Sequence, residues 1–452
     1  MLNRRQFLRS GLRSAMGLGL ASVVPLSVFS SMSASASEEY RAVICVLLAG
    51  GADSFNILVP RGGTQYSHYQ NRRSDLALSQ SSLLPLDGVN NGAQFGLHPA
   101  MTSLQQRFNA GQAAMIANVG PLVGPTNRAS YEEGTAQLPL GLFSHSDQIL
   151  SWQTAMPSTR SGTGFGGRLI DALAARNSGL TLAGNISLSG NNSFQAGSSS
   201  GAYSINAADG IRNISGYQDN AAFKQVVDQL LDGGESSRLQ RVYADKIRSA
   251  IDTGDVFGAA LAQATALTTP FAQDGFSTAM KRIAELISVR EQLGVTRQTF
   301  FVTYGGWDHH EDTLAQQAQM LPALDAGLGQ LMAATEELGV SSQVTTFTIS
   351  DFGRTLTSNG KGSDHGWGGN AMMLGGAVRG AQIYGEFPEL VEDHPLDVGR
   401  GRFLPSTASD AMFAEIAGWM GVSGDALMQV LPNWSAFEGS PQGAGLQNLL
   451  YI

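Results

Sequence analysis

The feature that most constrains the fold of this chain is an uninterrupted apolar run, Ala42 to Leu48, that leads directly into Gly50, Gly51 and Asp53. A run without polar alternation is typical of a parallel strand that is buried on both faces of a sheet. Such a strand has helices above and below it, because parallel neighbours are joined by crossover connections. Two later segments have the same strand-like form, residues 299–304 and 344–350, and the loops after them carry Asp308 and Asp351.

The segments between these strands have the apolar spacing of crossover helices. Met101, Leu104 and Phe108 recur at helical intervals, the strand-like residues 113–119 follow them, and residues 313–338 have the length of a long helix. With 42% hydrophobic and 14% charged residues, the chain can build a core, unlike a disordered chain. We therefore predict an α/β fold with a mostly parallel central sheet flanked by helices.

The middle of the chain differs in composition from the segments around it. Residues 180–216 are rich in Gly, Ser and Asn and lack helical periodicity, whereas residues 218–293 carry two or three apolar stripes at helical spacing. We expect a helical and loop insertion at about residues 180–295 within a single domain, residues 37–452.

The first 36 residues have the form of an export signal that is removed from the mature protein. Arg4 and Arg5 form a twin-arginine pair, residues 15–29 are weakly apolar, and Ala34-Ser35-Ala36 is a small-residue cleavage site. The alternative is a membrane helix, but Pro25 and the many Ser and Gly residues make the run too short and too polar for a stable span. We expect export to the periplasm by the twin-arginine route.

Charge and hydropathy exclude several classes of partner. The mature chain would carry 24 basic and 37 acidic residues, a net charge of −13, which does not suit the neutralisation of nucleic acid phosphates. After the signal, no stretch reaches about 18 consecutive apolar residues, so we expect no stable membrane span. The single cysteine, Cys45, lies inside an apolar run and is predicted to be a buried structural thiol.

Acidic and imidazole side chains gather in the loops after the predicted strands. Asp53, Asp308 and Asp351 each follow a strand, His310 is close to Asp308, and His365 lies in a glycine-rich loop. Carboxylates and imidazoles together suit a divalent ion such as Zn or Mn, and several carboxylates are difficult to hold together without a cation. A lone aspartate at a strand end is more commonly a helix cap or a turn residue, which is the alternative for each of the three.

Two further segments provide candidates for catalysis. Ser144 and His145 follow a long loop that contains prolines, and Arg354 comes three residues after Asp351. One interpretation of Arg354 is that its guanidinium forks onto an anionic substrate. The other is that it is a structural partner of the nearby acids.

The order of these elements resembles the alkaline phosphatase superfamily, which includes phosphatases, sulfatases and cofactor-independent phosphoglycerate mutases. More closely, it resembles the domain-of-unknown-function family 1501, a family of exported proteins assigned to that superfamily. The resemblance covers nearly all of residues 41–440. The segments that carry it are residues 305–310, 350–355, 362–369, 375–384 and 399–405.

The resemblance implies an alkaline-phosphatase-like core and a site for one or two divalent ions. It implies that Ser144 occupies the position of the nucleophile. The ion ligands that it implies are Asp308, His310 and His365 for the first ion, and Asp53 and Asp351 for the second.

The sequence departs from the superfamily pattern beside these ligands. Phe352 stands where a histidine commonly follows the late strand aspartate, and Asp308 and His310 are closer together than is usual. We expect either a single ion, with His145 or His309 replacing the missing imidazole, or a site that binds without turnover. Of the two histidines, His145 is favoured, because it adjoins the candidate nucleophile Ser144.

Two functions follow from the resemblance and its departures. The first is hydrolysis or transfer of a phosphate or sulfate ester in the periplasm, with a small anionic ester as the substrate. The alternative is a non-catalytic, metal-stabilised binding or assembly protein with a partner protein in the cell envelope. The Ser144-His145 pair favours the enzyme, and Phe352 favours the alternative.

Overall fold

The computed structural model describes residues 39–89, 92–177, 181–210, 217–232, 237–444, 446 and 448–451. The predicted export signal, residues 1–36, lies outside the described residues. Within the described ranges, no helix combines the length and the apolar character that a membrane crossing requires.

Nine described strands form one large sheet: β1 (Arg41–Ala49), β5 (Ala113–Gly120), β6 (Asn185–Ser187), β7 (Tyr203–Ser204), β8 (Arg297–Gly305), β9 (Val344–Ser350), β10 (Gly369–Gly375), β11 (Gln382–Tyr384) and β12 (Thr407–Ala408). Their order is β11, β5, β10, β9, β1, β8, β6 and β7, and β12 also pairs with β5. Neighbouring strands are parallel, except that β10 runs antiparallel to β5 and β9. The predicted α/β fold with a mostly parallel central sheet is therefore confirmed.

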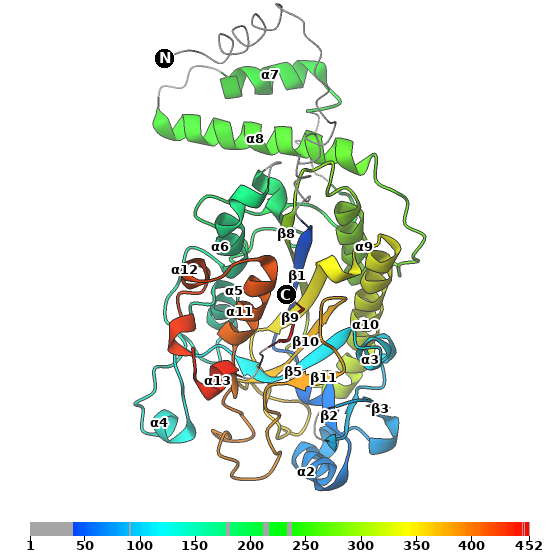
Figure 1. Cartoon of the computed structure of the whole chain (residues 1–452), viewed down its shortest axis with the longest axis vertical. Coiled ribbons are helices and arrows are strands. Elements are labelled where there is room, and N and C mark those ends of the chain that lie inside the picture. The colour runs from blue at the N-terminus through cyan, green and yellow to red at the C-terminus, as the bar shows by residue number, and fades with distance from the viewer. Residues whose placement is uncertain are drawn as a thin grey trace, which may run out of the picture. The chain divides into compact units, whose positions relative to one another are not determined.

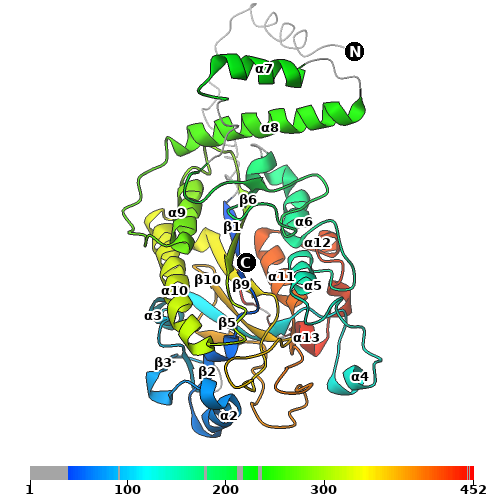
Figure 2. The same ribbon diagram turned by 180° about the vertical axis from the view of Figure 1, so that it is seen from behind.

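Alternate residues of β1 face two different cores, which explains why this strand is apolar throughout. Ala42 and Ile44 belong to the core on one face of the sheet, and Val43 and Cys45 to the core on the other. Cys45 is fully buried. Figures 1 and 2 show the sheet between two layers of helices, α3 (Thr102–Asn109), α9 (Gly275–Ser288) and α10 (Thr313–Glu337) on one side, and α5 (His145–Thr154), α6 (Phe165–Ala172) and α11 (Ser409–Met420) on the other.

The region predicted as an insertion contributes in part to the main sheet and its core. β6 pairs with β8, β7 pairs with β6, and α9 packs against the sheet. Two further helices, α7 (Ala221–Asp232) and α8 (Arg238–Leu261), lie side by side in Figures 1 and 2. The carboxylate of Asp228 on α7 lies 2.6 Å from the guanidinium of Arg248 on α8. These two helices carry the exposed apolar side chains Phe223, Val226, Leu230, Leu239, Val242, Tyr243 and Val256.

A small layer of structure follows β1 directly. It contains a three-stranded antiparallel sheet and the helix α2 (Gly63–Arg73), whose last residue is fully buried.

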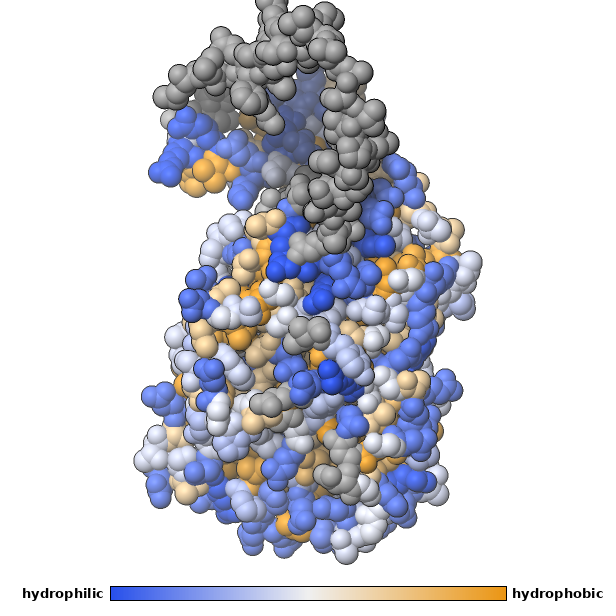
Figure 3. All heavy atoms as spheres, viewed as in Figure 1, coloured by the Kyte–Doolittle hydropathy of each residue, from blue (hydrophilic) through white to orange (hydrophobic). Residues whose placement is uncertain are grey.

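Hydrophilic and hydrophobic residues are interspersed over the face of the molecule in Figure 3. The remaining elements are β2 (Leu58–Pro60), β3 (Leu84–Pro85), β4 (Phe95–Leu97), α4 (Arg128–Glu132), α12 (Asp425–Val430) and α13 (Pro441–Ala444).

Candidate metal centre

The loops after β1, β8 and β9 emerge at one edge of the sheet, because these three strands are parallel neighbours. Ala49 of β1 is in register with Gly305 of β8, and Leu48 of β1 is in register with Ser350 of β9. The strands therefore end at the same level. This edge is where open α/β sheets usually bind their ligands.

The turn after β1 requires glycine at two positions. Gly50 and Gly51 have φ angles of +120° and +82°, which side chains strongly disfavour. A Cβ atom on Gly50 would lie 2.5 Å from the backbone nitrogen of Asp308, and one on Gly51 would lie 2.5 Å from the ring of Phe352. The three loops therefore approach one another too closely for a side chain at either position.

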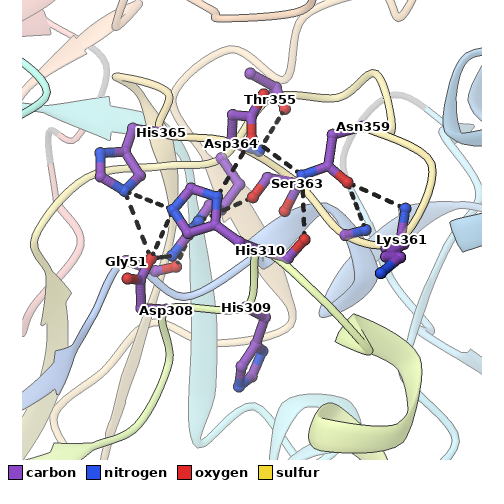
Figure 4. Close-up of polar contacts among 12 residues, drawn as sticks. Gly51, Asp308, His309, His310, Thr355, Asn359, Lys361, Ser363, Asp364 and His365 are labelled. Atoms are coloured by element: carbon purple, nitrogen blue, oxygen red, sulfur yellow. Dashed lines mark hydrogen bonds and ion pairs between the residues drawn. The ribbon is translucent and has the colours of Figure 1, made fainter.

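Asp308 lies at the centre of a cluster with three histidines. Nε2 of His145 lies 3.5 Å from Oδ2 of Asp308. Nε2 of His310 and Nε2 of His365 lie 3.1 and 3.5 Å from Oδ1 of the same carboxylate. Figure 4 shows His310 and His365 pointing toward Asp308, whereas His309 points away from them.

The second ring nitrogen of each of these histidines is already engaged by an oxygen acceptor. Carboxylate and carbonyl oxygens only accept hydrogen bonds, so each Nδ1 atom donates. In a neutral ring, the lone pair then lies on Nε2, on the side of Asp308. The three contacts are Nδ1 of His145 to Oδ2 of Asp351 at 2.7 Å, Nδ1 of His310 to Oδ1 of Asp364 at 3.2 Å, and Nδ1 of His365 to the carbonyl of Phe143 at 2.9 Å.

The positions of these lone pairs fit a bound cation. Nε2 of His310 lies 2.9 Å from Nε2 of His365. Two neutral nitrogens that face each other with lone pairs repel, and a metal ion bonded to both removes that repulsion. Donor atoms of His145, Asp308 and His365 also lie within 4.8 Å of one another. Imidazole nitrogens and a carboxylate oxygen are the donor set of zinc and related divalent ions.

The protonation of the cluster agrees with this donor set. Burial lowers the pKa of His365, and the positive charge of Arg354 acts in the same direction. Burial acts to raise the pKa of Asp308, but the hydrogen bond and the charge of Arg354 outweigh it, so this pKa lies below its usual value. At neutral pH the imidazole of His365 is therefore neutral and the carboxylate is ionised, the forms in which both groups bind metals.

Arg354 holds the loops of the site together. Its side chain is completely buried and pairs with Asp308. Nε donates to the carbonyl of Gly51 at 2.7 Å, Nη1 to the carbonyl of Ser363 at 2.9 Å, and Nη2 to the carbonyl of Gly50 at 2.6 Å. Since all three nitrogens donate to the protein, this geometry favours the structural interpretation of Arg354 over the substrate fork.

Asp53 lies outside the cluster of Asp308 and the three histidines, although the resemblance implies that it binds an ion. Its Oδ2 atom accepts hydrogen bonds from Nη2 of Arg73 at 2.7 Å and from the hydroxyl of Ser363 at 2.6 Å. The side chains of Asp53 and Arg73 are both fully buried. The charge of this carboxylate is therefore balanced by a guanidinium.

Asp351 reaches the cluster only through a histidine. It is 1% exposed, and its oxygens accept from the backbone N–H of Gly50 at 2.9 Å and from Nδ1 of His145. A carboxylate in this position fixes the tautomer and the orientation of a histidine that binds a metal. Asp351 thus has the geometry of an orienting residue, which differs from the direct ligand that the resemblance implies.

Ser144 is the residue directly before α5. Its hydroxyl lies 3.4 Å from that of Ser146. Among the described residues, no hydrogen bond joins the Ser144 hydroxyl to Asp308 or to the three histidines.

Phe352 packs against the imidazoles of the cluster. Its ring is 2% exposed, and the ring centroids of His145 and His365 lie 4.9 and 4.3 Å from its own. His309 is 3% exposed and turned away from the cluster (Figure 4). Of the two histidines expected to replace the missing imidazole, His145 is therefore the one that the structure places beside Asp308.

Two residues of the site escaped the sequence analysis. Asp364 accepts a hydrogen bond from His310 and pairs with Arg400 at 2.7 Å. Its position directly before His365 was a usable signal, because carboxylates commonly orient metal-binding histidines. Arg73 lies at the end of a helix outside every motif, and no pattern in the sequence connects it with Asp53.

Solved structures similar to this chain share little sequence identity with it, and no curated protein matches it. One is Ps i-CgsB in complex with k-i-k-neocarrahexaose, at 13% identity and a TM-score of 0.34, with 89% of this chain and 77% of that chain covered. Another is the lipoteichoic acid synthase LtaP from Listeria monocytogenes, at 8% identity and a TM-score of 0.36, with coverage of 87% and 76%. A third is a mutant of the alkaline phosphatase PafA, at 12% identity and a TM-score of 0.27, with coverage of 74% and 64%.

One family model matches most of the chain, residues 40–412. The match begins just before β1 and ends within α11, so it includes Asp308 and the three histidines around it. The family is described as a protein of unknown function, DUF1501. The chain therefore belongs to the DUF1501 family.

Proposed function

We propose that this protein binds a divalent ion, Zn or Mn, and uses it to hydrolyse or transfer a phosphate or sulfate ester. The ligands in this proposal are Asp308, His145, His310 and His365. The observation that carries it is that three imidazoles, each held at Nδ1 by an oxygen acceptor, direct Nε2 toward one carboxylate. We call these four residues the Asp308 cluster.

The residues of the Asp308 cluster suit this chemistry because they are fixed and still accessible. Their side chains are between 24% and 45% exposed, so they are accessible from the solvent. A bound divalent ion would polarise the ester and lower the pKa of a hydroxyl or a water molecule. Asp351 and Asp364 hold two of the rings in place, so little reorganisation is needed when the substrate binds.

Ser144 is the proposed nucleophile on the basis of the resemblance and its position next to His145. To act in this way, its hydroxyl must turn from Ser146 toward the Asp308 cluster. This requirement, together with the apolar ring of Phe352 beside the imidazoles, favours the alternative proposal of a non-catalytic envelope protein in which the ion stabilises the loops.

Ion analysis and an ester screen distinguish the two proposals. We expect the purified protein to contain a divalent ion and to cleave at least one of a set of phosphate monoesters, phosphate diesters and sulfate esters, with the activity lost in a chelator. His145→Ala should weaken ion binding by about 10- to 100-fold or more, because it removes a ligand. Ser144→Ala should keep the ion and lose the activity.

The matched control is His394→Ala, a half-buried histidine outside the cluster, which should change neither the ion content nor the activity. Cleavage that persists in Ser144→Ala removes this serine as the nucleophile. A bound ion without cleavage of any ester supports the envelope protein instead. A protein that binds no ion contradicts both proposals.

The location of the protein is part of the proposal. We infer from Arg4-Arg5 and Ala34-Ser35-Ala36 that it is exported to the periplasm by the twin-arginine route. Replacing both arginines by lysine should leave the uncleaved precursor in the cytoplasm, as measured by cell fractionation and the mass of the chain. Normal maturation of that variant would exclude this route.

A further inference from the structure

We infer that the centre holds a single divalent ion and that the guanidinium of Arg73 supplies the positive charge at the place where the resemblance implies a second ion. This inference rests on the proposed function, since it concerns the same site. Three groups would have to form the second ion site: the carboxylates of Asp53 and Asp351, and an imidazole at position 352. In the structure, both carboxylates are in contact with other groups, and position 352 carries a phenylalanine.

The first group, Asp53, is already part of a complete buried ion pair. Nη2 of Arg73 lies 2.7 Å from Oδ2 of Asp53, and neither side chain is exposed. The same guanidinium also donates from Nε to Asn56 at 3.2 Å and from Nη1 to the carbonyls of Thr355 and Leu356 at 3.2 and 3.3 Å. The guanidinium of Arg73 therefore donates from all three of its nitrogens within the fold, and its charge balances that of Asp53.

Of the other two groups, one is engaged in other contacts and one lacks a donor atom. Both oxygens of Asp351 accept hydrogen bonds, one from Gly50 and one from His145. Position 352 carries a phenyl ring, and this ring lies so close to Gly51 that a Cβ atom there would be 2.5 Å from it. Phe352 therefore fills the space with an apolar group that has no donor atom.

One oxygen remains at this place, and it cannot form a metal site alone. Oδ1 of Asp53 is buried and has no hydrogen-bond partner among the described residues. Protein-bound divalent ions need four or more ligands, several of them usually from the protein. Within the described part of the chain, the candidate ligands gather at Asp308: donor atoms of His145, Asp308 and His365 lie within 4.8 Å of one another, and Nε2 of His310 lies 3.1 Å from Asp308 and 2.9 Å from Nε2 of His365.

The number of ions per chain tests the inference directly. The full-length protein is saturated with Zn or with Mn, passed through a desalting column, and analysed for metal and protein. We expect about one ion per chain with either metal. Two ions per chain would overturn the inference and leave the proposed function intact, whereas no ion at all would overturn the proposed function on which it rests.

Phe352→His tests whether the missing imidazole alone accounts for the missing ion. We expect this variant to retain one ion per chain, because Arg73 still neutralises Asp53. Phe352→Leu is the matched control, since it removes the ring without adding a ligand. A second ion in Phe352→His but not in Phe352→Leu would show that Arg73 does not take the place of a cation.

A double variant tests the role of Arg73 in charge balance. Arg73→Ala should lower the melting temperature of the ion-saturated protein, because it leaves a buried carboxylate without its counterion. Asp53→Asn in the same chain should restore part of that loss, with one ion per chain in both variants. A double variant with a lower melting temperature than Arg73→Ala would overturn the charge-balancing role. If Arg73→Ala does not fold, the ion counts of the wild type and of Phe352→His remain decisive.

Discussion

Asp308→Asn is expected to weaken ion binding at the centre severely. This change removes the carboxylate that faces all three histidines, and it leaves the three imidazoles without a negatively charged ligand beside them. Since loss of an orienting partner alone typically costs about 10- to 100-fold in affinity, loss of this charged ligand should cost at least about 100-fold. Titration with Zn or Mn, followed by calorimetry, measures the effect.

Glu311→Gln is the matched control for Asp308→Asn. Glu311 belongs to the same loop, its side chain is 68% exposed, and its carboxylate lies 3.6 Å from the ammonium group of Lys361. This variant also loses one negative charge, but it should bind the ion as the wild type does. Equal losses in the two variants would indicate a general electrostatic effect of the loop, and unchanged affinity in Asp308→Asn would exclude this carboxylate as a ligand.

Arg354→Met is expected to destabilise the protein more than any other single change at this edge of the sheet. The wild-type guanidinium donates to the carbonyls of Gly50, Gly51 and Ser363 and pairs with Asp308. Without it, these buried acceptors lose their partner, which should cost about 3–5 kcal/mol of the free energy of unfolding. Denaturant unfolding of the ion-free protein measures this cost without a contribution from the metal.

Arg400→Met is the control for Arg354→Met, because it removes an arginine that lies on the surface. Arg400 is 47% exposed and forms an ion pair with Asp364, which is worth less than about 1 kcal/mol at such a position. If Arg354 instead contacts the substrate, Arg354→Met will unfold like the wild type and will show only weaker binding of the ester. That result would support the other interpretation that the sequence left open, in which the guanidinium of Arg354 binds an anionic substrate.

Much of the fold could be predicted because local pattern and tertiary environment agree. The strand expected at residues 344–350 is β9, and the helix expected at residues 313–338 is α10, which ends one residue earlier. The apolar run at residues 42–48 is buried on both faces, as its lack of alternation indicates. Residues 180–295 were harder to assign, because β6 and β7 are too short to have a visible period and their place in the sheet depends on β8.

The structure brings together the loops that the sequence indicated for the candidate site, since the ends of parallel strands meet at one edge. This geometry brings Asp308 and His310 to the same place as His365, which is far away in sequence. The sequence also restricted the substitute for the missing imidazole to His145 or His309. The sequence favoured His145, because it adjoins the candidate nucleophile, and the packing shows that His309 turns away.

The sequence by itself determined the fold class, the edge of the sheet that carries the site, and the residue types available there. Only the tertiary structure decided what each carboxylate does. Asp53, Asp308 and Asp351 look alike in sequence, since each follows a buried strand. They differ in their partners: Arg73 neutralises Asp53, His145 engages Asp351, and three histidines surround Asp308. Those partners come from helices and loops that are distant along the chain, and the chemistry of a carboxylate depends on the charges and donors within a few ångströms of it.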